Sequence, residues 1–228
     1  GSWRHISETS AAVYWTREEI SKSANRLLEY GKTRELGKAT AETEKPRWAH
    51  FHRMKGLEPG TKYYYRMVVV DPETGQRNES EILQLKPERV KKAVYVPQDM
   101  EGNPPYVLER KDANYVLTED IIADGTAFIV QATGITLDLD GHTVTFGNNT
   151  SEQVFGVQIV NEGSVKVVNG KIVQGARSAD YSAAIRSYKN NPGTEICGIS
   201  TDVHLPNAHP MMFRHDQLSV HHNDIYSR

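Results

Sequence analysis

The feature that most constrains the fold of this chain is a short β pattern that recurs in its second half. Residues 137–144 read LDLDGHTV and residues 165–173 read VKVVNGKIV, and from Gly141 to Gly170 the chain advances by 29 residues (170 minus 141). A period in this range is the signature of a solenoid, in which each repeat buries its apolar face only against its neighbours. The repeat therefore predicts stacked coils of parallel strands.

The same texture continues on both sides of these two segments. Aliphatic residues occupy every second position of each expected strand. Asn, Asp or Gly stands at the corners, where the backbone must take a left-handed conformation that these residues tolerate. From Asn169 to Asn223 the chain advances by 54 residues (223 minus 169), about two further turns of roughly 27. We expect the other strands of the coils at residues 115–121, 126–130, 154–159, 183–186, 196–199 and 211–214.

Residues 115–144 resemble the pectin-lyase-like superfamily of right-handed parallel β-helices, and in particular its PbH1-type repeats. The first coils of that family often read YxLTxDI followed by ITLDLDGHTI, and here residues 115–121 read YVLTEDI and residues 135–144 read ITLDLDGHTV. The resemblance implies an extracellular, cell-surface or periplasmic protein. Enzymes of this superfamily cleave acidic polysaccharides by β-elimination or hydrolysis, with Ca²⁺ or paired carboxylates and an Arg or Lys base on one outward face, so Ca²⁺ is the cofactor that the resemblance allows.

The first 90 residues show a different pattern, of short alternating strands separated by turns. Strands are expected at residues 12–15, 26–30, 48–52 and 63–70, as in an antiparallel sandwich. Residues 57–63 read LEPGTKY and resemble the LxPGTxY corner of fibronectin type III domains, which implies that Tyr63 is the corner tyrosine. Residues 9–15 read TSAAVYW and are similar to the second strand of that family, which implies that Trp15 lies in the core.

Residues 28–31 and 52–57 look like the fibronectin III variant that precedes bacterial surface enzymes and purple acid phosphatases. A phosphatase would also need the metal-binding segments GDxG, GNHE and GHxH, and none occurs in this chain, so we set that activity aside. His50 and His52 alternate on one expected strand and therefore share a face. Two interpretations stay open for this pair: a two-ligand metal edge, or a solvent-facing strand, which we favour.

Charge and composition narrow the range of partners expected for this chain. The 27 basic and 29 acidic side chains leave a formal net charge of −2. No broad basic field is available to hold a nucleic-acid backbone, so we expect no nucleic-acid partner. No apolar run approaches the ~20 residues of a membrane span, so we expect none. Cys197 is the only cysteine, and we expect a small buried residue there and assign no metal ligands.

These patterns divide the chain into a fibronectin III-like sandwich at residues 1–90, a linker and leading segment at 91–113, and parallel β-helix coils at 114–228. The expected fold class is therefore all-β, with an immunoglobulin-like sandwich followed by a short right-handed parallel β-helix. The sequence stops at Arg228 in mid-coil without the polar cap that solenoids need. We expect either a truncated chain or self-association through the uncapped last coil.

Histidine gathers near the C-terminus, where five of the nine histidines are mixed with arginine and aspartate. Histidine titrates near neutral pH and can also hold a transition metal, and arginine pairs with carboxylates, so we take Arg214, His215 and His222 as catalytic candidates. Solvated histidines on the outside of the solenoid are the alternative. Asp138 and Asp140 could form a carboxylate pair, but they fit a structural corner equally well.

Insertions in a solenoid gather on its binding face, so the outward loops expected at residues 174–195 and 202–210 are candidate binding regions. Within them, Arg186, Tyr188 and Lys189 are the substrate-binding candidates. Aromatic rings stack on sugar faces, and cations pair with uronate carboxylates. The alternative is an ordinary polar loop.

Three hypotheses about function follow, and fold analogy carries much of their weight. The first is an extracellular or periplasmic protein that binds an acidic polysaccharide or surface glycan, with lyase-type β-elimination or glycoside hydrolysis as the reaction if it is an enzyme. The second is a non-catalytic structural or adhesin module of the cell surface, and the third is an N-terminal fragment of a longer β-helix enzyme. Convergent charged groups on successive coils would favour catalysis, and smooth faces would favour a structural role.

Overall fold

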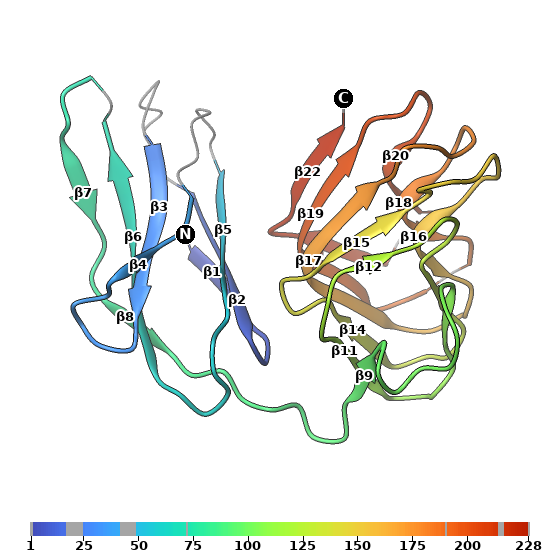
Figure 1. Cartoon of the computed structure of the whole chain (residues 1–228), viewed down its shortest axis with the longest axis horizontal. Coiled ribbons are helices and arrows are strands. Elements are labelled where there is room, and N and C mark those ends of the chain that lie inside the picture. Colours follow the sequence, from blue (N-terminus) through green and yellow to red (C-terminus); the bar gives the residue numbers. More distant parts are fainter. Residues whose placement is uncertain are drawn as a thin grey trace. The chain divides into compact units, whose positions relative to one another are not determined.

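The computed structural model describes residues 2–16, 25–41, 49–71, 73–189, 191–213 and 217–227. Every regular element in these residues is a strand, so the expected all-β class is confirmed. The chain divides into two compact units, Gly1–Arg89 and Val90–Arg228 (Figure 1).

The first unit consists of two antiparallel sheets, as expected for a fibronectin III-like sandwich. One sheet has the order β1-β2-β5, with β1 at Ser2–Ile6, β2 at Ser10–Thr16 and β5 at Ala49–Lys55. The other has the order β4-β3-β6-β7, with β8 also paired to β6. Its strands are β3 (Asn25–Gly31), β4 (Lys38–Ala39), β6 (Tyr63–Val70), β7 (Arg77–Glu79) and β8 (Leu83–Leu85).

Two aromatic residues named from the sequence occupy the expected places in this sandwich. Trp15 is buried in the core with Val13, Leu28 and Met54. Tyr63 is also buried, and its hydroxyl accepts a hydrogen bond of 3.0 Å from the backbone N–H of Glu58. This bond closes the Pro-Gly turn onto the start of β6, so the predicted tyrosine corner is confirmed.

His50 and His52 do not face solvent, and the interpretation that we favoured from the sequence is wrong. Both side chains are buried, and both rings lie against Trp15, with centroids 5.4 and 5.2 Å away. Nδ1 of His52 lies 3.0 Å from the hydroxyl of Thr40. Alternation placed the two histidines on one face correctly, but that face is the core of the sandwich, where aromatic packing and a hydroxyl partner make imidazole acceptable.

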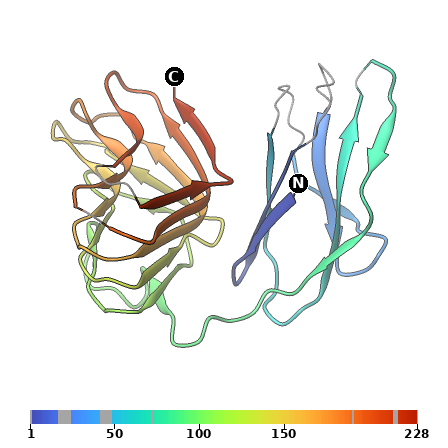
Figure 2. The same ribbon diagram turned by 180° about the vertical axis from the view of Figure 1, so that it is seen from behind.

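The second unit is a parallel β-helix built from two sheets whose strands alternate along the chain (Figures 1 and 2). We call the first of them sheet 1; its order is β10-β13-β16-β18-β20, and all of its pairs are parallel. Its strands are β10 (Tyr106–Leu108), β13 (Phe128–Val130), β16 (Phe155–Ile159), β18 (Ala183–Ser187) and β20 (His209–Met212).

The remaining strands of this unit form sheet 2, which is also parallel throughout. A coil consists of one strand of sheet 1 and then one long or two short strands of sheet 2. Those strands are β9 (Val94–Val96), β11 (Asn114–Leu117), β12 (Ile121–Ile122), β14 (Ile135–Asp138), β15 (Thr143–Phe146), β17 (Val165–Gln174), β19 (Thr194–Val203), β21 (Leu218–His221) and β22 (Asp224–Ser227). Because β9 and β10 pair with later strands, the segment expected to be linker already contributes to the coils.

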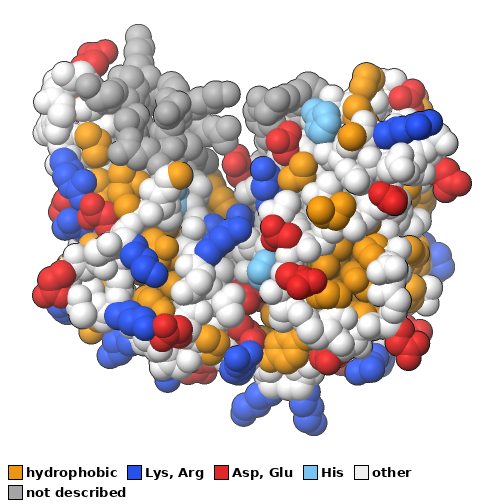
Figure 3. All heavy atoms as spheres, in the orientation of Figure 1, with side chains coloured by type: hydrophobic (Ala, Val, Ile, Leu, Met, Phe, Trp, Pro, Cys, Tyr) orange, Lys and Arg blue, Asp and Glu red, His pale blue; other side chains and the backbone are white. Residues whose placement is uncertain are grey.

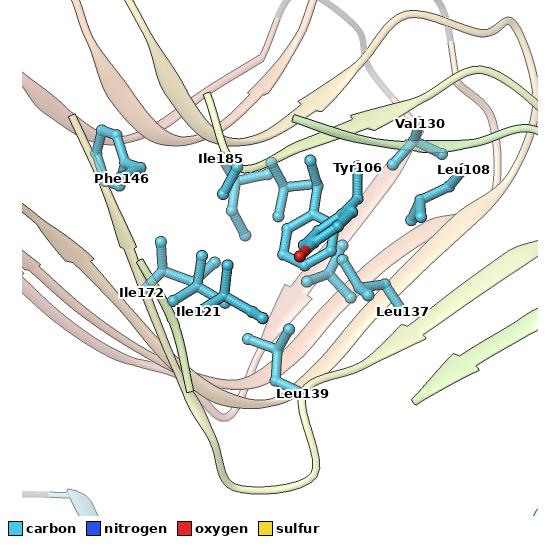
Figure 4. Packing of buried hydrophobic residues seen from close by; sticks show 14 of the residues in the cluster. Tyr106, Leu108, Ile121, Val130, Leu137, Leu139, Phe146, Ile172 and Ile185 are labelled. Carbon is cyan, nitrogen blue, oxygen red and sulfur yellow. The ribbon is translucent and has the colours of Figure 1, made fainter. Parts of the chain in front are cut away.

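The core of the β-helix lies between the two sheets (Figure 4). Leu137, Val167 and Ile196 are paired in register on successive coils, and all three are fully buried. Figure 4 shows Leu137, Ile172 and Ile185 among the side chains that meet in this space. Each buried aliphatic side chain contributes about 1.5–3 kcal/mol through burial, so the stacked columns hold the coils together.

The corners of sheet 2 follow one column of left-handed residues. Asn169, Gly198 and His222 have φ of 49°, 66° and 52°, and the strand register aligns them. Asn223, which the spacing placed in this column, is therefore one position too late. Its amide group instead accepts a hydrogen bond from the N–H of Ile199 (2.8 Å) and donates one to the carbonyl of Ile196 (2.9 Å), which ties the two coils together.

The repeat length varies from coil to coil, which explains this shift. Leu137 pairs with Tyr115 on the coil before it and with Val167 on the coil after it, and the second of these steps is the longer one. From Ile196 to its partner Val220 the step is short again. A fixed period therefore places the later corners only approximately.

Candidate functional site

Of the three catalytic candidates from the sequence, His222 is the one that lies within the described residues. Arg214 and His215 lie outside those residues. His222 directly follows strand β21. Nδ1 of His222 lies 2.7 Å from Nδ1 of His221. Burial lowers the pKa of His222, and the charge of His221 lowers it further. A catalytic role for the three residues remains a prediction from the sequence.

Asp138 and Asp140 form a corner of the backbone, as one of the two interpretations expected. Oδ1 of Asp138 accepts a hydrogen bond of 2.8 Å from the N–H of Asp140, whose φ is 41°. Both side chains are buried. This geometry supports a structural turn in which the first carboxylate stabilises the left-handed residue two positions later.

Arg186 lies on strand β18, so residues 174–195 are not one outward loop, and that expectation is corrected. Neighbouring Ile185 and paired Val157 belong to the core, whereas Arg186 points to the outer face of sheet 1. Its guanidinium carbon lies 3.9 Å from the ring centroid of Tyr188 and 5.3 Å from that of Phe155. The two rings themselves meet edge to face. The cation is thus held between two aromatic side chains.

Two exposed tyrosines lie at the two ends of β18. Tyr188 follows the strand and is 37% exposed, and Tyr181 precedes it and is 57% exposed. The ring of Tyr181 stacks on His209, a residue of the neighbouring strand β20. Lys189 forms an ion pair of 3.0 Å with Glu162 beside this region. We call Tyr181, Arg186 and Tyr188 the tyrosine strip.

Arg186 makes few polar contacts although its side chain is largely buried. The residue is only 8% exposed, and its one hydrogen-bond partner in the described part of the chain is the thioether sulfur of Met212, at 3.7 Å. Thioether sulfur is a weak acceptor, whereas guanidinium carries five N–H donors. The strip therefore holds a fixed cation whose strong donor capacity is largely unused.

A second group of polar side chains lies on the outer face of sheet 2. Glu195 and Cys197 are two residues apart on β19 and share a face, and the register pairs Cys197 with His221 on β21. Nε2 of His221 lies 3.1 Å from Oε1 of Glu195, and Sγ of Cys197 lies 3.7 Å from the same oxygen. Oε2 of Glu195 forms an ion pair of 2.5 Å with Lys166 on the preceding coil. This group was not predicted from the sequence because it forms only through the register of three coils.

The environment of this group changes the acidity of two members. Burial, with a further contribution from the charge of Glu195, raises the pKa of Cys197 to about 12. The hydrogen bond from Lys166 lowers the pKa of Glu195, in spite of the opposing effect of burial. The carboxylate is therefore ionised at neutral pH, whereas the thiol stays protonated unless an electrophile displaces its proton.

Within the described residues, no group of three or more carboxylates gathers into a site for the Ca²⁺ that the β-helix resemblance allows. Ca²⁺ takes about six to eight oxygen ligands from carboxylates, carbonyls and water. Within the described ranges, the one group of three possible metal ligands is Glu195, Cys197 and His221, which offers one carboxylate, one thiol and one imidazole. This donor set suits a softer transition metal.

The surface shown in Figure 3 carries acidic and basic side chains interspersed over both units. Among the described residues on that face no field of a single sign is present, so recognition of a charged ligand by them must depend on local groups. The described part of the chain also contains no helix long and apolar enough to cross a bilayer.

Comparison with known proteins agrees with the fold of the first unit. Residues 2–86 match the family described as the N-terminal domain of purple acid phosphatases, a fibronectin III-like fold. The match covers the sandwich alone, in line with the missing metal-binding segments of a phosphatase. No curated protein gives a significant match to the sequence.

Several solved structures are similar to the chain. A pectate lyase of Erwinia chrysanthemi, solved with tetragalacturonic acid, is 13% identical over 98% of this chain and 77% of its own, with a TM-score of 0.32. A family 28 exopolygalacturonase of Yersinia enterocolitica is 8% identical over 98% and 67%, with a TM-score of 0.42. A pectate lyase of Pectobacterium carotovorum is 11% identical over 99% and 84%, with a TM-score of 0.34. The β-helix of the second unit is defined by its own strand pairing.

Proposed function

We propose that this chain is a secreted or surface-exposed protein that binds an acidic polysaccharide through the outer face of sheet 1. The observation that carries the proposal is Arg186, which two aromatic rings hold in place while its N–H donors meet only a thioether sulfur in the described residues. A uronate carboxylate accepts two parallel hydrogen bonds from a guanidinium, so it is a suitable partner. Because the cation is already ordered, little conformational entropy is lost on binding.

The aromatic rings supply the second half of the recognition. Tyr181 and Tyr188 are exposed and lie at the two ends of β18, so sugar units of one extended chain can reach both. A sugar ring presents an apolar C–H face that can lie on a tyrosine ring, which also buries apolar area. Lys189 adds a second, exposed cation at one end of the strip. Its ion pair with Glu162 joins two exposed side chains and is weak enough to be exchanged for a ligand carboxylate.

Isothermal titration calorimetry with oligosaccharides tests this proposal. Acidic oligomers from pectin, alginate, glycosaminoglycan and ulvan would be compared with a neutral oligomer of similar length. We expect at least one acidic oligomer to bind, with an affinity that falls as salt rises, and the neutral oligomer to bind at least ten-fold more weakly. Tyr188→Ala should weaken binding, and Tyr64→Ala, a half-buried tyrosine of the first unit, should leave it unchanged. Equal binding of acidic and neutral oligomers would contradict the proposal.

Whether the protein cleaves the bound polysaccharide is a separate question, and the same mixtures of protein and oligosaccharide answer it. A lyase removes the proton at C5 of the uronate and breaks the C4–O bond, which creates a double bond that absorbs ultraviolet light. A hydrolase creates reducing ends without that absorbance. Growth of either signal would make Arg214, His215 and His222 the first residues to replace. Binding without either signal would favour a non-catalytic module.

A further inference from the structure

The atoms of Glu195, Cys197 and His221 converge on one point on the outer face of sheet 2, a different face from the tyrosine strip. Oε1 of Glu195, Sγ of Cys197 and one ring nitrogen of His221 all lie within 4.8 Å of one another. Two of these residues come from β19 and the third from β21, the strand of the following coil. The cluster therefore lies across the boundary between two coils.

Two of the three separations between these atoms are close to those around a tetrahedral zinc ion. With Zn–O and Zn–N bonds of about 2.0 Å and a Zn–S bond of about 2.3 Å, tetrahedral angles separate O from N by about 3.3 Å and S from O by about 3.5 Å. The corresponding distances in the structure are 3.1 Å from Oε1 to Nε2 and 3.7 Å from Oε1 to Sγ. An ion could thus be accommodated with shifts of a few tenths of an ångström.

Two outer partners orient the side chains of Glu195 and His221. Lys166 binds Oε2 of Glu195 and leaves Oε1 directed at the cluster. His222 lies against Nδ1 of His221, so that Nε2 points to Glu195. Metal-binding sites commonly fix their histidine and carboxylate ligands through such a second layer of contacts, which sets the ring orientation and strengthens binding.

We propose that Glu195, Cys197 and His221 bind one divalent transition-metal ion of the Zn²⁺ class, which links the last two coils of the β-helix across sheet 2. Thiolate, imidazole and a single carboxylate are the ligands that Zn²⁺ and its neighbours prefer. The three protein ligands leave a fourth position for water. Because the ligands lie on adjacent coils, bound metal opposes separation of β21 from β19 and stabilises the C-terminal part of the solenoid.

Titration of the reduced, metal-free chain with Co²⁺ tests this site, since Co²⁺ binds in zinc sites and reports a thiolate ligand by a near-ultraviolet charge-transfer band. The chain has one cysteine, so such a band can come only from Cys197. We expect the band to saturate at one ion per chain and to be lost when Zn²⁺ is added. Cys197→Ser should abolish the band, and His221→Asn should weaken Co²⁺ binding at least ten-fold. His204→Gln is the matched control, because His204 is exposed on a neighbouring loop, and it should change nothing.

A second measurement on the unaltered chain keeps the test decisive if a variant fails to fold. Bound Zn²⁺ should slow alkylation of Cys197 and should raise the melting temperature of the second unit. Absence of a thiolate band together with unchanged alkylation would overturn the site. Saturation at one ion per two chains would also overturn it, because the metal would then bridge two molecules. Neither outcome bears on glycan binding, which depends on residues of sheet 1.

Discussion

The guanidinium carbon of Arg186 lies 3.9 Å from the ring centroid of Tyr188, and the same cation is covered on another side by Phe155. Such stacking contributes about 0.5–2 kcal/mol, depending on how far the pair is removed from water. It also fixes the side chain of an arginine that would otherwise lose rotamer entropy on binding a ligand. The contact therefore predicts that Tyr188 acts on ligand affinity partly through Arg186.

Replacing Tyr188 by phenylalanine or by leucine separates these contributions. Phenylalanine keeps the ring face and the cation–π contact, so Tyr188→Phe should retain affinity for an acidic oligosaccharide to within about three-fold. Leucine keeps apolar volume but lacks the π face, and its loss of about 1–2 kcal/mol corresponds to roughly a five- to thirty-fold weaker affinity. Calorimetric titration gives both values. Equal affinities for the two variants would show that the ring face plays no part.

The tyrosine corner of the first unit makes a stability prediction. Tyr63→Phe removes the acceptor of the Glu58 N–H while the ring remains, so it should lower the free energy of unfolding by about 1–2 kcal/mol. Tyr64→Phe, the neighbouring position, should change it by less than about 0.5 kcal/mol. All three tryptophans of the chain lie in residues 1–89, so urea unfolding followed by tryptophan fluorescence reports on this unit. A Tyr63→Phe variant as stable as the control would contradict the structural role of the corner.

The hydrogen bonds of Asn191 predict a corresponding loss of stability for the β-helix when this residue is replaced. Its buried amide donates to the carbonyls of Asn161 (2.6 Å) and Gly163 (3.1 Å) in the preceding coil. Asn191→Ala leaves the buried Asn161 acceptor and the partly buried Gly163 acceptor without that donor and should destabilise the second unit by about 1–3 kcal/mol. Exposed Asn149→Ala is the control and should have little effect. Thermal unfolding followed by circular dichroism measures the change, and an unchanged tryptophan transition would localise it to the β-helix.

Ionisation of Glu29 should make the stability of the first unit depend on pH in the acidic range. Burial alone would raise the pKa of this carboxyl, but the hydrogen bonds and charges of Arg77 and Arg66 outweigh it and lower the pKa below 4.5. A lowered folded pKa means that the ion pairs stabilise the fold above the unfolded pKa, and that this stability is lost as the pH falls through the folded value.

Glu29→Gln tests this dependence. At neutral pH the variant should lose about 0.5–1 kcal/mol, a modest amount because the side chain of Glu29 is 22% exposed to solvent. The difference from the unaltered chain should disappear well below pH 4.5, where the native carboxyl is also neutral. Urea unfolding at a series of pH values gives both numbers, with Glu73→Gln as an exposed control. A difference that stays constant down to low pH would rule out ionisation of Glu29 as its origin.

Much of the fold was predictable because both units rely on local signals. The Pro-Gly corner at Tyr63 and the strand motif at Trp15 fix the position of the sandwich sheets, and period-two alternation places each strand. In the second unit, the left-handed corner at Asn169 marks one turn of the solenoid. His50 and His52 show where such signals stop: alternation gives the shared face but does not say that Trp15 and Thr40 make it a buried one.

The sites were less predictable because they depend on register between coils. Cys197 meets His221 only because the repeat is shorter at that coil than at the two coils before it. A single sequence does not fix such changes. Arg186 was identified as a cation near a tyrosine, but its place on a strand between two rings follows from the pairing of β16 with β18.

The most direct test of the central claim compares one polysaccharide in two forms. Polygalacturonate and the same polymer with its carboxyl groups reduced to alcohols differ only in charge and in the acceptors that Arg186 would bind. We expect the chain to bind the carboxylate form at least ten-fold more tightly, and Arg186→Gln to remove most of that preference while the second unit keeps its thermal stability. Equal affinity for the two polymers, or an unchanged preference in Arg186→Gln, would contradict recognition of an acidic glycan by the tyrosine strip.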